Sequence, residues 1–227
     1  MKTRGRPDFP ILLLTLFLVG FGIVIVYSAS SVFSLYNYGT DTYFVKKQVM
    51  WAVIGLVAML FTMNVPYTFY KKHFLTIALI IFLLLLAVLI PGIGVLRNGA
   101  RSWINLGVGL LQPAEFAKLA IIIYLSALIA KKGGKIRDLK TGLLPVLVIV
   151  SIFCMMIAIQ PDFGSAAILM MTAVTVIVAG GANLKHLFMF GIPVGIVGFL
   201  FIILSEYRRN RLLHFGDPWA DGLSGLG

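Results

Sequence analysis

The chain has 227 residues, of which 60% are hydrophobic and 12% charged, whereas soluble domains carry about 25% charged residues. So little polar surface excludes a soluble globular fold, and the apolar residues fall in long runs separated by short basic loops. The net charge of +11 does not indicate nucleic-acid binding. The basic residues lie near the ends of apolar runs and form no stripe interleaved with aromatic side chains.

Seven apolar segments predict an all-α, polytopic transmembrane helical bundle, which we treat as a single domain over residues 1–227. Each has about 15 to 20 residues, at or slightly below the ~20 needed to cross a bilayer, so we expect flanking residues to extend them. The first is longer than the 7–15-residue core of a signal peptide, which favours an uncleaved span. The segments are 10–29, 49–63, 74–90, 116–130, 143–159, 163–179 and 187–204.

The distribution of Lys and Arg predicts a cytoplasmic N-terminus. In that orientation the cytoplasmic segments hold 11 of the 19 basic residues, the external segments hold seven, and Lys118 lies near a helix end. Seven external basic residues is a high count for the positive-inside rule. Seven spans would then place the tail, residues 206–227, outside the cytoplasm.

Ionisable residues at membrane depth cost about 2.5–3.5 kcal/mol on insertion scales, so each needs a reason. In the external segment 97–118, glycines and Pro113 interrupt an apolar sequence, which predicts a partly re-entrant loop leading into the fourth span. Pro113 also favours a helix start here, with Glu115 in the first turn. Glu115 and Lys118 are three residues apart and share a helix face, which fits a structural ion pair as well as a functional site.

Two further external segments carry candidate residues. Asp162 precedes the sixth span, where capping the helix N-terminus is the usual role of Asp. Arg208, Arg209 and Arg211 lie outside the cytoplasm, against the positive-inside trend. Their guanidinium groups suit a pyrophosphate-bearing lipid, and contact with ordinary headgroups is the alternative.

The sequence gives no support for an ATPase, an oxidoreductase or a serine hydrolase. It contains no Walker loop, no dinucleotide fingerprint and no Gly-x-Ser-x-Gly elbow. His73, His186 and His214 lie on different loops without metal-ligand spacing, so we predict no metal site. Gly191 and Gly195 form a GxxxG motif suited to close helix contact, although this motif is common by chance in apolar sequence.

Five short motifs occur in order along nearly the whole chain. They are YSAS at 27–30, GARSWI at 99–104, QPAE at 112–115 with Lys118, QPDFG at 160–164, and Arg211 with DPW at 217–219. As a set they resemble the SEDS family, which includes FtsW, RodA and the sporulation protein SpoVE. The Asp-Pro-Trp form is closer to FtsW and SpoVE than to RodA.

The resemblance implies a ten-span glycosyltransferase of the bacterial cytoplasmic (inner) membrane, working in cell division or sporulation with a class B penicillin-binding protein. Such an enzyme polymerises lipid II at the outer face: a sugar hydroxyl attacks an anomeric carbon, and undecaprenyl pyrophosphate leaves. A carboxylate would act as general base and cations would stabilise the leaving group. A divalent cation is the one cofactor left open.

Site residues also follow from the resemblance. Glu115 and Lys118 would line the central cavity, and Arg101 and Asp162 would belong to the same external constellation. Arg208 and Arg211 are the candidates for binding the substrate pyrophosphate.

This chain departs from the family pattern in length. Seven predicted spans stand where the family has ten, and the aspartate usually taken as catalytic base would lie beyond Gly227. We therefore assign no catalytic base, and expect an N-terminal part of the enzyme that is inactive alone. Two other functions stay open: a lipid II flippase, motivated by polar groups within a multi-span bundle, and a non-catalytic scaffold holding a partner's helix against Gly191 and Gly195.

Overall fold

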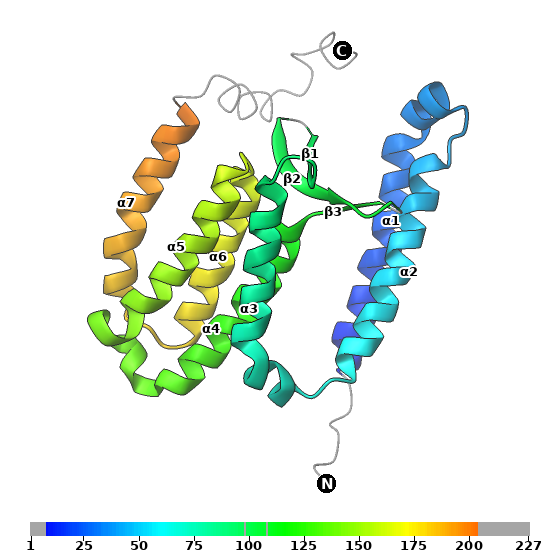
Figure 1. Ribbon diagram of the computed structural model, residues 1–227. Helices are drawn as coiled ribbons and strands as arrows, with labels where there is room; N and C mark the ends of the chain where they lie inside the picture. The colour runs from blue at the N-terminus through cyan, green and yellow to red at the C-terminus, as the bar shows by residue number, and fades with distance from the viewer. Residues whose placement is uncertain (1–7, 98, 108, 204–227) are drawn as a thin grey trace. The chain divides into compact units, whose positions relative to one another are not determined.

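The computed structural model describes residues 8–97, 99–107 and 109–203 (Figure 1). The chain divides into two compact units, Met1–Phe69 and Tyr70–Gly227, which are described separately. Each of the seven predicted apolar segments coincides with a helix. The candidate residues of the tail, including Arg208 and Arg211, lie outside the described residues.

Unit 1 is a pair of helices, α1 (Phe9–Tyr38) and α2 (Tyr43–Met63), packed against each other. The predicted first span ended at residue 29, but the helix continues for two and a half further turns. In this extension the Ser30 and Asn37 side chains donate to the backbone carbonyls of Val26 and Phe33 one turn earlier, so their polar groups are satisfied within the helix. The extension therefore mixes such polar side chains with exposed apolar ones, including Val32, Phe33 and Leu35.

Unit 2 contains the remaining helices, linked between α4 and α5 by short 3₁₀ and π turns. α3 leaves helical geometry at His73, where φ is −107° and ψ is 16°. The helices are α3 (Tyr67–Leu89), α4 (Pro113–Lys132), α5 (Leu144–Ile159), α6 (Phe163–Ala179) and α7 (Leu184–Ile203), and the turns are Gly133–Arg137 and Leu139–Leu143.

Helix α4 lies at the centre of the unit 2 core. Its buried positions recur at helical spacing, and it packs against both α5 and α6. Several of these residues are small, so neighbouring helices can approach closely. Close packing matters here because lipid supplies little hydrophobic driving force for helices to associate. The fully buried α4 side chains are Ala114, Ala117, Ile121 and Leu125.

A three-stranded antiparallel sheet connects α3 to α4, where the sequence predicted a loop. Its strands are β1 (Gly94–Arg97), β2 (Ala100–Asn105) and β3 (Leu110–Leu111), in the order β1-β2-β3. Gly99 and Gly107, read from the sequence as interruptions, have φ of 78° and 82° in the turns between these strands. Glycine adopts this left-handed backbone without steric cost, so both residues turn the chain back into the sheet.

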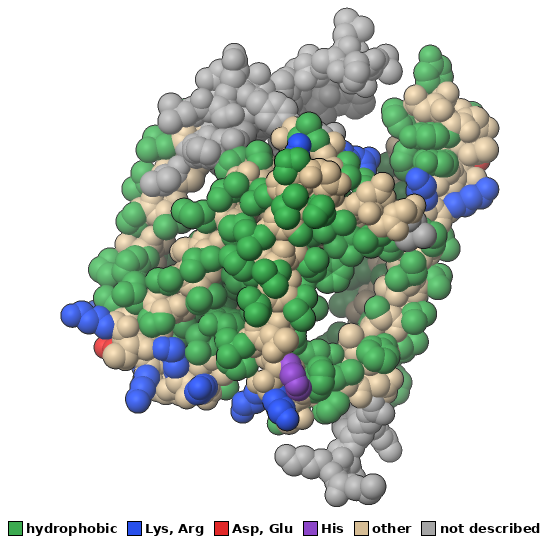
Figure 2. Space-filling view, in the orientation of Figure 1, with side chains coloured by type: hydrophobic (Ala, Val, Ile, Leu, Met, Phe, Trp, Pro, Cys, Tyr) green, Lys and Arg blue, Asp and Glu red, His purple; other side chains and the backbone are tan. Residues whose placement is uncertain are grey.

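Five helices of the described residues are long and apolar enough to cross a membrane: Phe9–Tyr38, Tyr43–Met63, Tyr67–Leu89, Pro113–Arg137 and Leu139–Ala158. Two shorter apolar helices follow, Phe163–Ala179 and Leu184–Leu200. Large hydrophobic side chains are exposed along all of them, and Figure 2 shows Lys and Arg gathered along the lower edge of unit 2. This pattern suits an apolar surrounding along the helices and a polar one at their ends.

Candidate functional site

The structure brings two of the sequence motifs together at one end of unit 2. The first supplies the start of α4 and the second supplies the start of α6, and these two helices pack against each other. The β2 strand, which carries a third motif, contacts α4. Figure 1 shows the sheet and the start of α6 at the end opposite the basic edge.

Glu115 and Lys118 form an ion pair in the first turns of α4, as their spacing predicted. Lys118 Nζ lies 2.8 Å from each carboxylate oxygen of Glu115. The Lys118 side chain is 21% exposed and that of Glu115 is 54% exposed. The carboxylate is therefore accessible from outside the packed core, while the lysine stem is largely covered.

Asp162 caps α6, as its position before an apolar run predicted. Its Oδ1 accepts from the backbone N–H of Ser165 at 3.2 Å. Its Oδ2 accepts from Gln112 Nε2 at 2.5 Å, across 50 residues of sequence. Both carboxylate oxygens are thus engaged, one within α6 and one toward α4.

Gln112 is a site residue that the sequence analysis did not single out. It is the N-cap residue of α4, and its side-chain amide reaches Asp162 at 2.5 Å and Ser165 Oγ at 3.4 Å. The same Gln-Pro pair recurs at residues 160–161, before the cap of α6. That repeat at two helix starts was the available signal.

Gln160, the other Gln-Pro glutamine, ties the α5–α6 turn to α3. Its side chain is fully buried, and its Nε2 donates to the carbonyl of Leu85 at 3.0 Å. Its Oε1 has no hydrogen-bond partner within the described residues. The bond to Leu85 and the complete burial of the side chain fix this turn against α3.

Arg101 lies on β2, half-buried, opposite Leu96 of β1. No hydrogen bond or ion pair joins it to Glu115 or Asp162 in the part of the chain that the structure describes. Its side chain packs instead over Gly94, where an added Cβ would come within 2.8 Å of Arg101 Cγ. Among the same described residues, no cluster of three His, Cys, Asp or Glu side chains could hold a metal ion.

The Gln112–Asp162 contact gives a stability prediction for the purified full-length protein. Asp162→Ala removes a helix cap, which costs about 0.5–2 kcal/mol, and a hydrogen bond to a carboxylate, which costs about 1.5–3 kcal/mol. We expect an unfolding free energy lower by about 2–4 kcal/mol in a denaturant titration. In a double-mutant cycle with Gln112→Ala, coupling of about 1 kcal/mol or more is expected.

Asp8→Ala is the matched control, because Asp8 caps α1 by accepting from the Ile11 N–H at 3.3 Å and, within the described residues, makes no side-chain hydrogen bond to another helix. It should cost the cap alone, about 0.5–2 kcal/mol. Additive effects of Gln112→Ala and Asp162→Ala would contradict the cross-helix contact.

Comparison with known proteins finds one matching family. The profile of a family described as cell cycle proteins, FtsW/RodA/SpoVE, matches residues 9–227. Stage V sporulation protein E of Bacillus subtilis is 38% identical over 221 residues, covering 97% of this chain and 60% of that protein. A probable peptidoglycan glycosyltransferase FtsW of Trichlorobacter lovleyi is 38% identical over 218 residues. The match covers 94% of this chain and 56% of the Trichlorobacter protein.

Solved structures share the fold. One describes the structural coordination of polymerization and crosslinking by a peptidoglycan synthase complex, with a TM-score of 0.62 and 26% identity, covering 89% of this chain and 60% of the matched one. The RodA of Thermus thermophilus has a TM-score of 0.59 at 23% identity, covering 78% and 58%. This chain is therefore a multi-pass helical membrane protein that spans about three fifths of its relatives' length.

Proposed function

The chain belongs to the FtsW/RodA/SpoVE family, and on that premise we propose that the complete protein is a peptidoglycan glycosyltransferase that polymerises lipid II. The relatives named above as probable peptidoglycan glycosyltransferases support this reaction type. The reaction joins the hydroxyl of one sugar to the anomeric carbon of another and releases undecaprenyl pyrophosphate.

The observation that carries the proposal is the accessible ion pair beside a fixed cross-helix network. Glu115 and Lys118 present a carboxylate and an ammonium on the first turns of α4. The hydrogen bond from Gln112 to Asp162 holds that helix start against α6. A positioned pair of opposite charges can orient a sugar hydroxyl and a phosphate oxygen together, which lowers the entropic part of a barrier.

The proposed roles follow the charges. Glu115 accepts a hydrogen bond from a substrate hydroxyl, and Lys118 faces an anionic oxygen of the pyrophosphate. Arg101 of β2, together with Arg208 and Arg211 of the tail, supplies further positive charge for the same leaving group. Asp162 positions the start of α4 rather than touching substrate, because both of its oxygens are already engaged. No general base is assigned.

We propose that this end of unit 2 faces the outside of the cytoplasmic membrane and that the N-terminus is cytoplasmic. Lys and Arg gather at the opposite end, around the α4–α5 connection and the start of α3 (Figure 2). An excess of basic residues on one side marks the cytoplasmic side.

The proposed partner is a class B penicillin-binding protein that cross-links the glycan product, in division or in sporulation. The similarity to a chain from a peptidoglycan synthase complex supports an assembly of this kind. In α7, Cβ atoms added at Gly191 and Gly195 would meet no atom within 4 Å. That open face is suited to close contact with another helix.

The test is glycan-strand formation from labelled lipid II by the purified full-length protein, with and without the penicillin-binding protein. We expect a ladder of polymer that is strengthened by the partner. A parallel assay follows translocation of labelled lipid II in liposomes. Translocation without polymer would replace the proposal with the flippase function, and stable co-purification with neither activity would replace it with the scaffold.

A further inference from the structure

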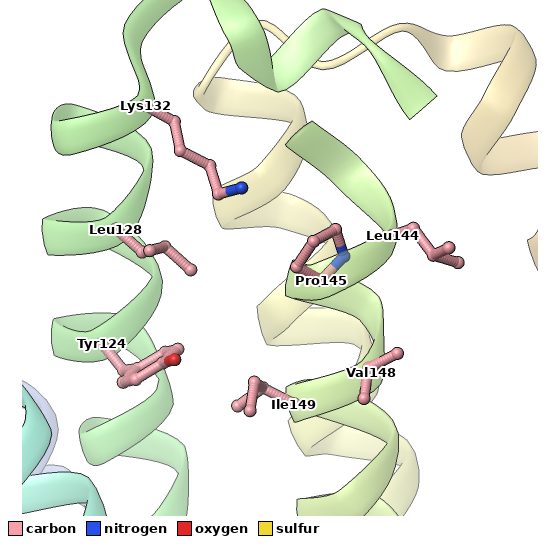
Figure 3. A pocket seen from close by; sticks show the side chains of 7 residues that line it. All are labelled: Tyr124, Leu128, Lys132, Leu144, Pro145, Val148 and Ile149. Atoms are coloured by element: carbon pink, nitrogen blue, oxygen red, sulfur yellow. The ribbon is translucent and has the colours of Figure 1, made fainter. Parts of the chain in front are cut away.

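A groove lies between α4 and α5 (Figure 3). Tyr124 and Leu128 of α4 lie opposite Pro145 and Ile149 of α5, and Lys132 lies at one end. The groove has a volume of about 510 Å³, inside the ~300–1,000 Å³ range of small-molecule sites. Apart from Lys132 its lining is apolar or aromatic, which suits a hydrocarbon chain.

The α5 wall of the groove is open to the surroundings. Leu144 is 40% exposed and Val148 is 49% exposed. Both belong to the segment Leu139–Ala158, which is long and apolar enough to cross a membrane. An exposed apolar wall at membrane depth is where a lipid chain can enter.

The ammonium group of Lys132 is fixed at the groove by a hydrogen bond. Its Nζ donates to the backbone carbonyl of Thr141, in the turn that precedes α5. An ammonium has three N–H donors, so two are left for the oxygens of a phosphate. A charged donor group therefore stands at the end of an apolar groove, in the arrangement of a phospholipid's headgroup and tail.

The turns around Lys132 add positive charge. Residues 131–140 contain five basic side chains and one acidic side chain, a net charge of +4. The acidic one, Asp138, is occupied locally: it accepts from Thr141 Oγ1 at 2.5 Å and from Thr141 N–H at 3.0 Å. These bonds hold the pKa of Asp138 below its ordinary value. The surrounding field favours an anion, because basic pockets between transmembrane helices bind anionic headgroups.

We propose that this groove is a binding site for an anionic phospholipid, with an acyl chain between α4 and α5 and the phosphate at Lys132. A zwitterionic lipid fits the apolar part equally well but gains less from the basic turns. A partner helix would gain from the cation only by placing a carboxylate or its C-terminal carbonyls at the groove's end, whereas an anionic headgroup always carries the matching charge. The site lies at the end of unit 2 opposite the candidate catalytic residues, so it is separate from lipid II chemistry.

The test is native mass spectrometry of the full-length protein with phosphatidylglycerol, cardiolipin or phosphatidylcholine added in turn. We expect retention of the two anionic lipids over phosphatidylcholine. Lys132→Ala should reduce that retention about fivefold, the effect of one basic residue near a headgroup, and Lys132→Arg should keep it. Val148→Trp, which fills the groove, should reduce retention of anionic lipid without removing any charge.

Lys71→Ala is the matched control, because Lys71 is an exposed basic residue of α3 and does not line the groove. It should leave lipid retention unchanged. Equal retention of phosphatidylcholine, or equal losses in Lys71→Ala and Lys132→Ala, would overturn the proposal. A photo-crosslinker at position 148 that captures another protein segment in place of lipid would overturn it as well.

Discussion

Replacing Glu115 by Gln is expected to lower glycan-strand polymerisation by the full-length protein at least 100-fold. Removing one positioned electrostatic group from an active site typically costs about 10²–10³ in rate. Glutamine keeps the size of the side chain but loses the carboxylate that holds Lys118 Nζ at 2.8 Å. The measurement is the initial rate of polymer formation from labelled lipid II, together with the unfolding midpoint.

Folding should survive this change. The Glu115 side chain is 54% exposed, and ion pairs with such exposure contribute about 0–1 kcal/mol to stability. A loss of activity with an unchanged unfolding midpoint would therefore separate a functional role from a purely structural one.

The spacing of Glu115 and Lys118 left open a second hypothesis, in which their ion pair has only a structural role. This hypothesis predicts a different result. If the pair serves only packing, Glu115→Gln with Lys118→Gln should restore activity, because the double variant leaves no unpaired charge. We expect no such restoration. Asp138→Asn is the control carboxylate, since it lies in the turns at the opposite end of unit 2; it should leave the polymerisation rate within twofold. Full activity of Glu115→Gln would contradict the assignment of Glu115 to the site.

Replacing Gly94 by Ala is expected to prevent normal folding of the segment between α3 and α4. An added Cβ would lie 1.9 Å from the carbonyl oxygen of Val88 and 2.8 Å from Arg101 Cγ. The Arg101 stem can move aside, but the Val88 carbonyl belongs to the backbone of α3 and cannot. We expect a loss of about 3 kcal/mol or more in unfolding free energy, the upper range for overpacking.

The readouts are the yield of monodisperse protein in detergent and its unfolding midpoint. Gly134→Ala is the matched control: Gly134 lies in the 3₁₀ turn after α4, and an added Cβ there meets nothing within 4 Å. It should change stability by less than about 0.5 kcal/mol. Normal yield and midpoint for Gly94→Ala would mean that β1 does not approach α3 this closely.

The sequence alone determined where the helices lie and where some of them end, because an apolar run and its capping residues are local features; α1, which runs nine residues past its predicted end, is an exception. Each predicted apolar run is a helix in the structure. The predicted segment 163–179 and the observed helix α6 have the same bounds. Pro113 and Pro145 stand in the first turns of α4 and α5, where proline's fixed φ and missing N–H are harmless. Asp162 lies three residues before Ser165, whose N–H it caps, and Glu115 lies three residues before Lys118. Local spacing was therefore enough to predict both contacts.

Only the tertiary structure decided what depends on residues far apart in the chain. The Gln112–Asp162 bond crosses 50 residues, and the Gln160–Leu85 bond crosses 75. The sheet was missed because its strands have two to six residues, too short for an alternating pattern to stand out in apolar sequence. The close fit at Gly94 and the groove beside Lys132 arise where separate elements pack, and hydropathy carries no record of which helix faces meet.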